Sequence, residues 1–217
     1  MTVRETPSTT SAVAVWDPVV RFGHWALVLA FAIAYFSAEE EKDGPDALHV
    51  WSGYVVAGIV ILRVLWGFVG SQHARFSDFV RPPADALRYL GGLARGRAPR
   101  YLGHSPAGAA MAIALLTLLA ATTLTGLIAY GELGRGPLAS LGGPVAPAPA
   151  GTAQSGPASA DQRARLKESA IGEIHETLAN ITLALIGLHV VGVIGASIAH
   201  RENLIAAMIT GRKRAEN

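Results

Sequence analysis

The chain has 217 residues, of which 51% are hydrophobic, and its formal charge is +2 at pH 7. Cysteine is absent, which excludes disulfides, iron–sulfur clusters held by thiolates, and haem attached covalently through a C-x-x-C-H motif. The apolar residues are concentrated in a few long runs, as in membrane proteins. Charge asymmetry across a membrane explains the mild basicity better than nucleic-acid binding does, so no nucleic-acid partner is expected.

Four apolar segments are each long enough, at ~1.5 Å per residue, to cross a ~30 Å hydrocarbon core as a helix. The pair Asp17-Pro18 indicates the start of the first helix, with Asp as the N-cap and Pro at the first helical position. The sequence therefore predicts an all-α integral membrane protein built as a four-transmembrane-helix bundle. The predicted spans are residues 18–38, 48–69, 107–130 and 171–199.

The segments outside the spans are polar, charged or low in complexity. Residues 1–15 are predicted to be a flexible N-terminal tail, and the Gly/Pro/Ala-rich residues 131–160 a flexible loop. The arginine-rich connector between the second and third spans contains a predicted short surface helix at 85–94. Residues 201–217 form a basic tail, so residues 16–200 make up the membrane domain.

Basic residues predict the orientation of the four spans. Four spans place both termini on one side of the membrane. The N-terminal segment, the second connector and the C-terminal tail contain twelve Lys and Arg residues, against five in the other two connectors. The positive-inside rule therefore predicts that both termini are cytoplasmic.

Histidines occur in three of the four spans. His175 and His189 in the fourth span are 14 residues apart, which places them on one helix face and ~21 Å apart along the axis. The predicted topology gives His24 the same depth as His189, near the cytoplasmic side. It likewise gives His49 the same depth as His175, near the outer side. Intramembrane ionisable residues are rare and usually functional, so these two pairs are the candidate site.

Two axial imidazoles from different helices are the ligand set of a haem, and helix bundles commonly build such sites. A zinc or di-iron site needs three or four ligands at one depth. Glu173 and Glu176 could contribute to such a site beside His175, but no carboxylate lies near His24 or His189. A proton relay would use the same residue types without explaining the matched pairs. Unrelated structural histidines remain the third alternative.

Four further polar residues have two interpretations each, and a fifth, His200, has one. Arg63 shares a face with the histidine of the second span, and a haem propionate would be a suitable partner. Its alternative is snorkelling to the membrane interface, which is the preferred interpretation for Arg21. His73 and His104 in the second connector could bond a propionate or conduct protons near a quinone, or could simply fix the connector. His200 is expected to be interfacial only.

Several short motifs lie along the chain. They are VWDPVVRFGHW at 15–25, HVWSGY at 49–54, RVLWGFVG at 63–70, HARFSDF at 73–79, GHSPAG at 103–108, His-Glu at 175–176, and His189. Together these stretches resemble the bacterial dihaem cytochrome b561 family and the related cytochrome b subunits of nickel–iron hydrogenases and formate dehydrogenases. The resemblance covers most of the chain outside the first dozen residues and the 131–160 loop. One departure is Ser105, where relatives often have asparagine before the proline.

The resemblance implies four transmembrane helices and two non-covalent b-type haems in the bacterial inner membrane. It implies that the iron ligands are His24 with His189 and His49 with His175, the same pairs that depth gives. Quinone is the implied substrate, with lipid around the bundle. A cytochrome c or a dehydrogenase or hydrogenase subunit is the implied redox partner, and a homodimer is left open.

The expected function is therefore electron transfer between a quinone pool and a redox partner. Imidazoles at both axial positions leave no open iron site, which suits electron transfer and disfavours oxygen activation. Whether the chain is itself an enzyme is left open. The alternatives are a self-contained oxidoreductase, such as one that moves electrons from superoxide to quinone, and a non-haem histidine-lined transporter.

Overall fold

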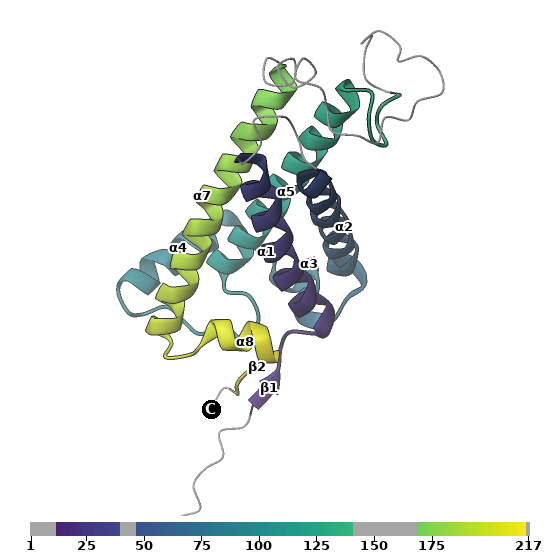
Figure 1. Ribbon diagram of the computed structural model, residues 1–217. Coiled ribbons are helices and arrows are strands. Elements are labelled where there is room, and N and C mark those ends of the chain that lie inside the picture. Colours follow the sequence, from purple (N-terminus) through teal and green to yellow (C-terminus); the bar gives the residue numbers. More distant parts are fainter. Residues whose placement is uncertain (1–11, 40–46, 141–168, 216–217) are drawn as a thin grey trace, which may run out of the picture. The chain divides into compact units, whose positions relative to one another are not determined.

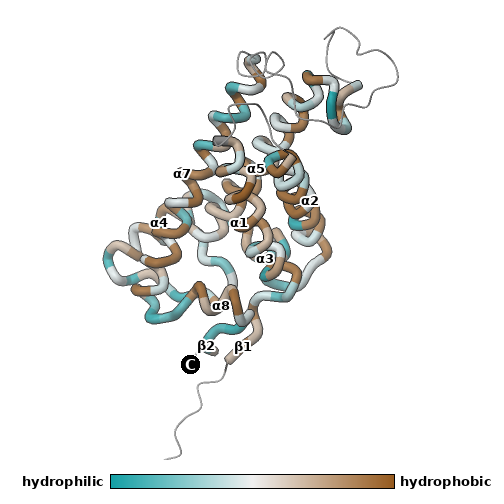
Figure 2. The backbone as a smooth tube through the Cα atoms, viewed as in Figure 1, coloured by the Kyte–Doolittle hydropathy of each residue, from teal (hydrophilic) through white to brown (hydrophobic). Residues whose placement is uncertain are grey.

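The computed structural model of the protein describes residues 12–39, 47–140 and 169–215 (Figure 1). Its long helices are α1 (Pro18–Glu39), α2 (Ala47–Val69), α5 (Pro106–Glu132) and α7 (Ala170–Ala199). All four are long and apolar enough to cross a membrane, and brown apolar segments dominate them in Figure 2. Their bounds lie within two residues of the predicted spans, because the apolar runs themselves set where each helix begins and ends.

The shorter elements are β1 (Ala12–Ala14), η1 (Gln72–Ala74), α3 (Phe76–Phe79), α4 (Pro83–Ala94), α8 (Leu204–Thr210) and β2 (Arg212–Arg214). Helix α4 begins two residues before the short surface helix that the sequence predicts. Strand β1 pairs antiparallel with β2, with Val13 opposite Lys213. Residues 12–14 are therefore a strand where a flexible tail was predicted, and the rest of the regular structure in the described ranges is helical.

The basic C-terminal tail is also more ordered than its composition predicts. The Asn203 side chain caps α8 by accepting a hydrogen bond from the Ala206 amide at 2.8 Å. Gly211 ends the helix in the left-handed conformation, with φ 79°, which glycine adopts without strain. These local signals turn the chain into β2.

The chain divides into two compact units. One comprises residues 22–65 and 112–189 and holds most of each long helix. Its core consists of Ala30 from α1, Val56 and Val60 from α2, and Leu119 from α5. Helix α7 is linked to α1 in this unit by a hydrogen bond from the Tyr35 hydroxyl to the Asn180 side chain at 2.8 Å.

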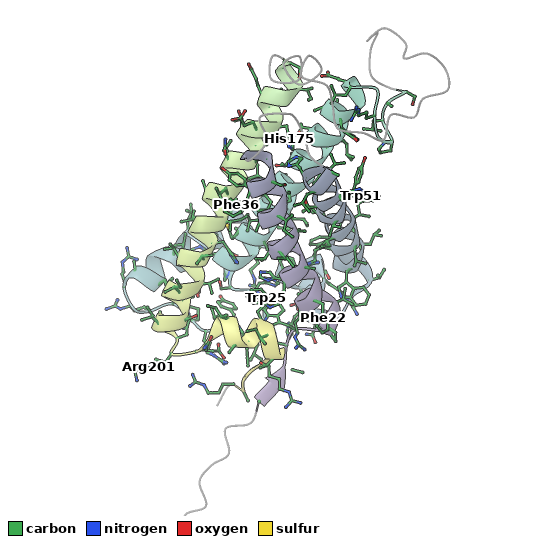
Figure 3. The ribbon with its side chains drawn as sticks, viewed as in Figure 1. Phe22, Trp25, Phe36, Trp51, His175 and Arg201 are labelled. Carbon is green, nitrogen blue, oxygen red and sulfur yellow. The ribbon has the colours of Figure 1, made fainter. Side chains whose placement is uncertain are left out.

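The outward faces of this unit are apolar. Trp51 is 68% exposed and Phe22 71% exposed, and Figure 3 labels both together with Phe36 and Trp25. Large exposed apolar side chains on four long helices are what a lipid-facing surface requires.

The other unit comprises residues 1–21, 66–111 and 190–217. In this unit Asp17 accepts hydrogen bonds from Trp66 Nε1 at 3.1 Å, Ser71 Oγ at 2.5 Å and the Val20 amide at 3.0 Å. Burial alone would raise the pKa of Asp17, but these hydrogen bonds outweigh it and lower the pKa. Asp17 therefore fastens the start of α1 to the end of α2.

A second polar cluster in this unit fastens the C-terminal segment. The buried Glu202 carboxylate accepts from Arg100 at 2.6 Å and lies 4.0 Å from Lys213 Nζ. Lys213 Nζ also donates to the Tyr101 carbonyl at 3.2 Å and lies 5.9 Å from the centre of the Trp16 ring. The pairing of β1 with β2 is thus backed by charged contacts.

Two parts of the segments between the spans lie outside the described residues. They are residues 40–46, between the first two spans, and the part of the predicted 131–160 loop that begins at residue 141.

Candidate functional site

Helices α2 and α7 bring the rings of His49 and His175 close together in an edge-on arrangement. Their ring centroids are 6.1 Å apart and the rings lie at 88° to each other. His49 Nδ1 donates to the Ala34 carbonyl on α1 at 2.8 Å, and His175 Nδ1 donates to the Thr122 carbonyl on α5 at 2.9 Å. A carbonyl can only accept, so both Nδ1 atoms carry the proton and both Nε2 atoms keep a lone pair. We call these two residues the carbonyl-bonded pair.

Helices α1 and α7 bring the rings of His24 and His189 close together. Their ring centroids are 6.5 Å apart, at an angle of 57°. Trp25 contacts the His24 ring edge-on, with centroids 5.3 Å apart. His24 Nδ1 is buried, and no hydrogen-bond partner for it exists within the described ranges. We call these two residues the second pair.

The separation within each pair fits a metal ion bound between two imidazoles. Metal–imidazole bonds of ~2.0–2.1 Å on opposite sides of one ion, with ~1.1 Å from each nitrogen to its ring centre, give a centroid separation of about 6.3 Å. The observed values are 6.1 Å and 6.5 Å. Aromatic pairs also pack at ~4.5–7 Å, so distance alone admits simple packing. The fixed tautomers of the carbonyl-bonded pair favour ligation, because metal-bound histidines commonly donate their other N–H to a carbonyl.

The donor set limits the kind of metal that the pairs could hold. Across the residues that the structure describes, no three His, Asp or Glu side chains lie close enough to hold one ion. Glu173 and Glu176 are exposed on α7 and do not complete a cluster with His175. Two imidazoles from different helices fit the protein ligand set of a haem better than that of a zinc or di-iron site.

Helix α5 packs closely against His175 of the carbonyl-bonded pair. A Cβ atom at Gly126 on α5 would lie 2.9 Å from His175 Cε1 and 3.2 Å from its Nδ1, so glycine is needed there. Thr125 Oγ1 lies 3.4 Å from the same Nδ1. In Figure 3 the His175 side chain lies among the helices.

Midway between the two pairs, α7 packs against α5 through threonines. Thr182 follows His175 by seven residues and precedes His189 by seven, so all three share one helix face. Its side chain is 0% exposed, donates to the Leu178 carbonyl at 2.7 Å and lies 3.4 Å from Thr122 Oγ1. Small, internally bonded side chains here let α5 approach α7 closely.

The two arginines of interest differ in their surroundings. Arg63 is half-buried inside α2, and its pairing with a propionate stays a prediction. Arg21 at the start of α1 donates to the Ile209 carbonyl of α8. The Arg21 guanidinium therefore hydrogen-bonds to the protein backbone. The snorkelling interpretation did not predict this bond.

The histidines outside the spans each contact a specific partner. His73 Nδ1 lies 3.0 Å from Asp78 Oδ2. The His104 ring lies between Phe79 and Trp16, with centroid distances of 4.3 Å and 4.8 Å. His200 Nε2 is 3.0 Å from the Tyr89 hydroxyl, a tie to α4 that the interfacial interpretation did not include.

Several contributors to the site could not be identified from the sequence. The acceptors for His49 and His175 are main-chain carbonyls, which every residue has. Gly126 is one of many glycines in membrane helices, so only its distance from His175 reveals its importance.

Comparison with known families gives one match. A family model described as prokaryotic cytochrome b561 matches residues 15–211, which include all four span histidines. No curated protein and no solved structure matches the chain.

Proposed function

The chain belongs to the prokaryotic cytochrome b561 family, and from that premise we propose that it is a dihaem cytochrome linking a quinone pool to a redox partner. Membership implies a multi-pass membrane protein that transfers electrons through b-type haem, in agreement with its four apolar helices. The proposal adds the number of haems, their ligands, quinone as the substrate, and an orientation with both termini in the cytoplasm.

The observation that carries the proposal is the geometry of the two histidine pairs. His49 and His175 would hold one haem iron, and His24 and His189 the other. The separations of 6.1 Å and 6.5 Å support this assignment. Arg63, half-buried in α2, is the proposed partner of a haem propionate.

Bound haem would supply reversible one-electron chemistry at each pair. The protein's own residues restrict that chemistry. If the two imidazoles of each pair held a haem iron, they would leave it no coordination position for oxygen or a substrate. The Ala34 and Thr122 carbonyls hold the rings of the carbonyl-bonded pair in one tautomer and make them stronger donors.

Quinone chemistry also requires proton transfer, because quinol oxidation releases protons with its electrons. In the connector after α2, His73 Nδ1 donates to Asp78, which leaves Nε2 as a proton acceptor. His73 is therefore our candidate for receiving a quinol proton, on the same side of the membrane as the termini. The proposed electron partner is a cytochrome c or the catalytic subunit of a hydrogenase or dehydrogenase.

The test is reduction of the purified cytochrome in lipid nanodiscs by a soluble quinol. We expect quinol to convert the haem absorbance spectrum from the oxidised to the reduced form. In a His73→Gln variant the rate of this reduction should be at least tenfold lower, and the spectra of both forms should be unchanged. The pH dependence of the rate should also flatten in that variant. Gln72→Ala, an exposed neighbour in η1, is the matched control. A wild-type protein that quinol does not reduce would refute the quinone link. A His73→Gln variant with normal rates would refute the proton acceptor alone.

A further inference from the structure

Helix α4 has an exposed apolar face outside the membrane spans. Leu87 is 72% exposed and Leu90 50% exposed. Pro83, Ala84 and Ala94 are also exposed and, at ~100° per residue, fall with the two leucines in a sector of about 120°. We call these five residues the α4 apolar stripe. Exposed apolar stripes of this kind usually have a partner.

The opposite face of α4 is fixed to the protein. Tyr89 is buried, and its hydroxyl lies 3.0 Å from Nε2 of His200, the residue after α7. The Tyr89 ring also packs edge-on against Tyr101, with centroids 5.9 Å apart. Since Tyr89 holds its face inward, α4 cannot rotate to bury its leucines against the rest of the chain.

The chain also keeps α4 close to the bilayer. It lies between α2, which ends at Val69, and α5, which begins at Pro106, and both are apolar enough to span a membrane. The connection at 95–105 spans at most ~40 Å when fully extended, and less as folded. The acyl chains beneath the bilayer headgroups are thus a large apolar region that is always within reach of the stripe.

Basic side chains border the stripe. Arg81 precedes α4, Arg88 lies at the edge of the stripe, and Arg95 and Arg97 follow the helix, all of them exposed. The acidic group within α4 is Asp85, which pairs with Arg88. An arginine fork matches the oxygens of a phosphate group. An apolar stripe with a basic border is the pattern of a helix that lies in the membrane interface.

We propose that α4 lies in the headgroup region of the bilayer, with Leu87 and Leu90 among the acyl chains and the arginines on the phosphates of anionic phospholipids. This role is independent of the haem assignment. A docked protein would be a different occupant, and the experiment below distinguishes the two.

The first measurement locates the stripe. Because the chain has no cysteine, Leu87→Cys, Leu90→Cys and Arg88→Cys can each carry a single nitroxide label in the full-length protein in nanodiscs. We expect labels at 87 and 90 to favour oxygen over a water-soluble nickel chelate at least fivefold more than the label at 88. Equal nickel access at 87 and 88 would overturn the proposal. Labels at 87 and 90 that are shielded from both reagents would indicate coverage by protein and would also overturn it.

The second measurement tests the choice of lipid. A fluorophore on Leu87→Cys is quenched by brominated phosphatidylglycerol or brominated phosphatidylcholine mixed into the nanodisc. Each arginine near an anionic membrane surface can raise binding up to about fivefold. Phosphatidylglycerol should therefore be enriched severalfold over phosphatidylcholine around the label at position 87. Replacing Arg88, Arg95 and Arg97 by Gln should bring that enrichment close to one, whereas Arg212→Gln in the tail should not change it. Equal quenching by both lipids in the wild-type protein would refute anionic selectivity.

Discussion

Gly126→Ala tests how tightly α5 holds the carbonyl-bonded pair. The added methyl carbon would lie 2.9 Å from His175 Cε1. Carbon atoms pack best at ~3.5–4.0 Å, so the imidazole must move by at least about 0.6 Å. Its 2.9 Å hydrogen bond to the Thr122 carbonyl would then stretch toward the limit of hydrogen bonding.

The magnitude follows from opposing effects. Replacing glycine by alanine inside a helix ordinarily stabilises by ~0.5–1 kcal/mol. Overpacking costs ~1–3 kcal/mol and a weakened hydrogen bond ~0.5–1.5 kcal/mol, so the free energy of unfolding should fall by about 0.5–4 kcal/mol. If His175 binds haem iron as proposed, losing the bond would also make it a poorer donor to the ferric state. A differential of ~1 kcal/mol corresponds to about 40 mV for one electron, so the potential of that haem should rise by tens of millivolts.

The assay is redox potentiometry of the haem absorbance, with thermal unfolding measured in parallel. Gly53→Ala on α2 is the matched control, because it lies one turn from His49 and a Cβ there meets no atom within 4 Å. That variant should be neutral or slightly more stable, with both potentials unchanged. Gly126→Ala with two wild-type potentials would refute the reasoning that the wall of α5 positions His175.

Three other predictions follow from the polar contacts. Asp17→Ala removes a helix cap and the acceptor for Trp66 and Ser71. The free energy of unfolding should therefore fall by ~2–4 kcal/mol at pH 7. Since the pKa of Asp17 is lowered by folding, its contribution is present above the unfolded-state pKa and lost as pH falls through the folded-state value. Thermal unfolding of variant and wild type should therefore converge in acid. Glu202→Gln leaves the half-buried Arg100 and the buried Lys213 without their carboxylate and should lower the free energy of unfolding by ~1–3 kcal/mol in the same assay. Potentiometry should also give the carbonyl-bonded pair the lower potential of the two haems, because two carbonyl bonds strengthen its donors.

The spans and the histidine pairs are predictable from sequence for a physical reason. A membrane core demands about 20 apolar residues per helix, so composition alone gives depth. Depth together with the helical period then matches His24 to His189 and His49 to His175, and the structure places the ring centroids of these pairs 6.5 Å and 6.1 Å apart. Their role as ligands stays a prediction.

Other parts of the molecule depend on contacts that no local pattern encodes. Strands β1 and β2 have three residues each and no alternation of apolar and polar side chains, and they pair across almost the whole chain. Asp17 can be identified as a cap from its neighbour Pro18, but its bonds to Trp66 and Ser71 arise only when the ends of two helices meet. The exposure of the α4 apolar stripe likewise becomes visible only once Tyr89 is seen to be buried.

Haem content per chain tests the central assignment most directly. Haem is extracted into pyridine and quantified against protein for the wild type, His175→Ala and His189→Ala. The account predicts two haems in the wild type and one in each variant, with different reduced spectra because each variant retains a different haem. A wild type with one haem, or either variant with two haems and an unchanged spectrum, would contradict it.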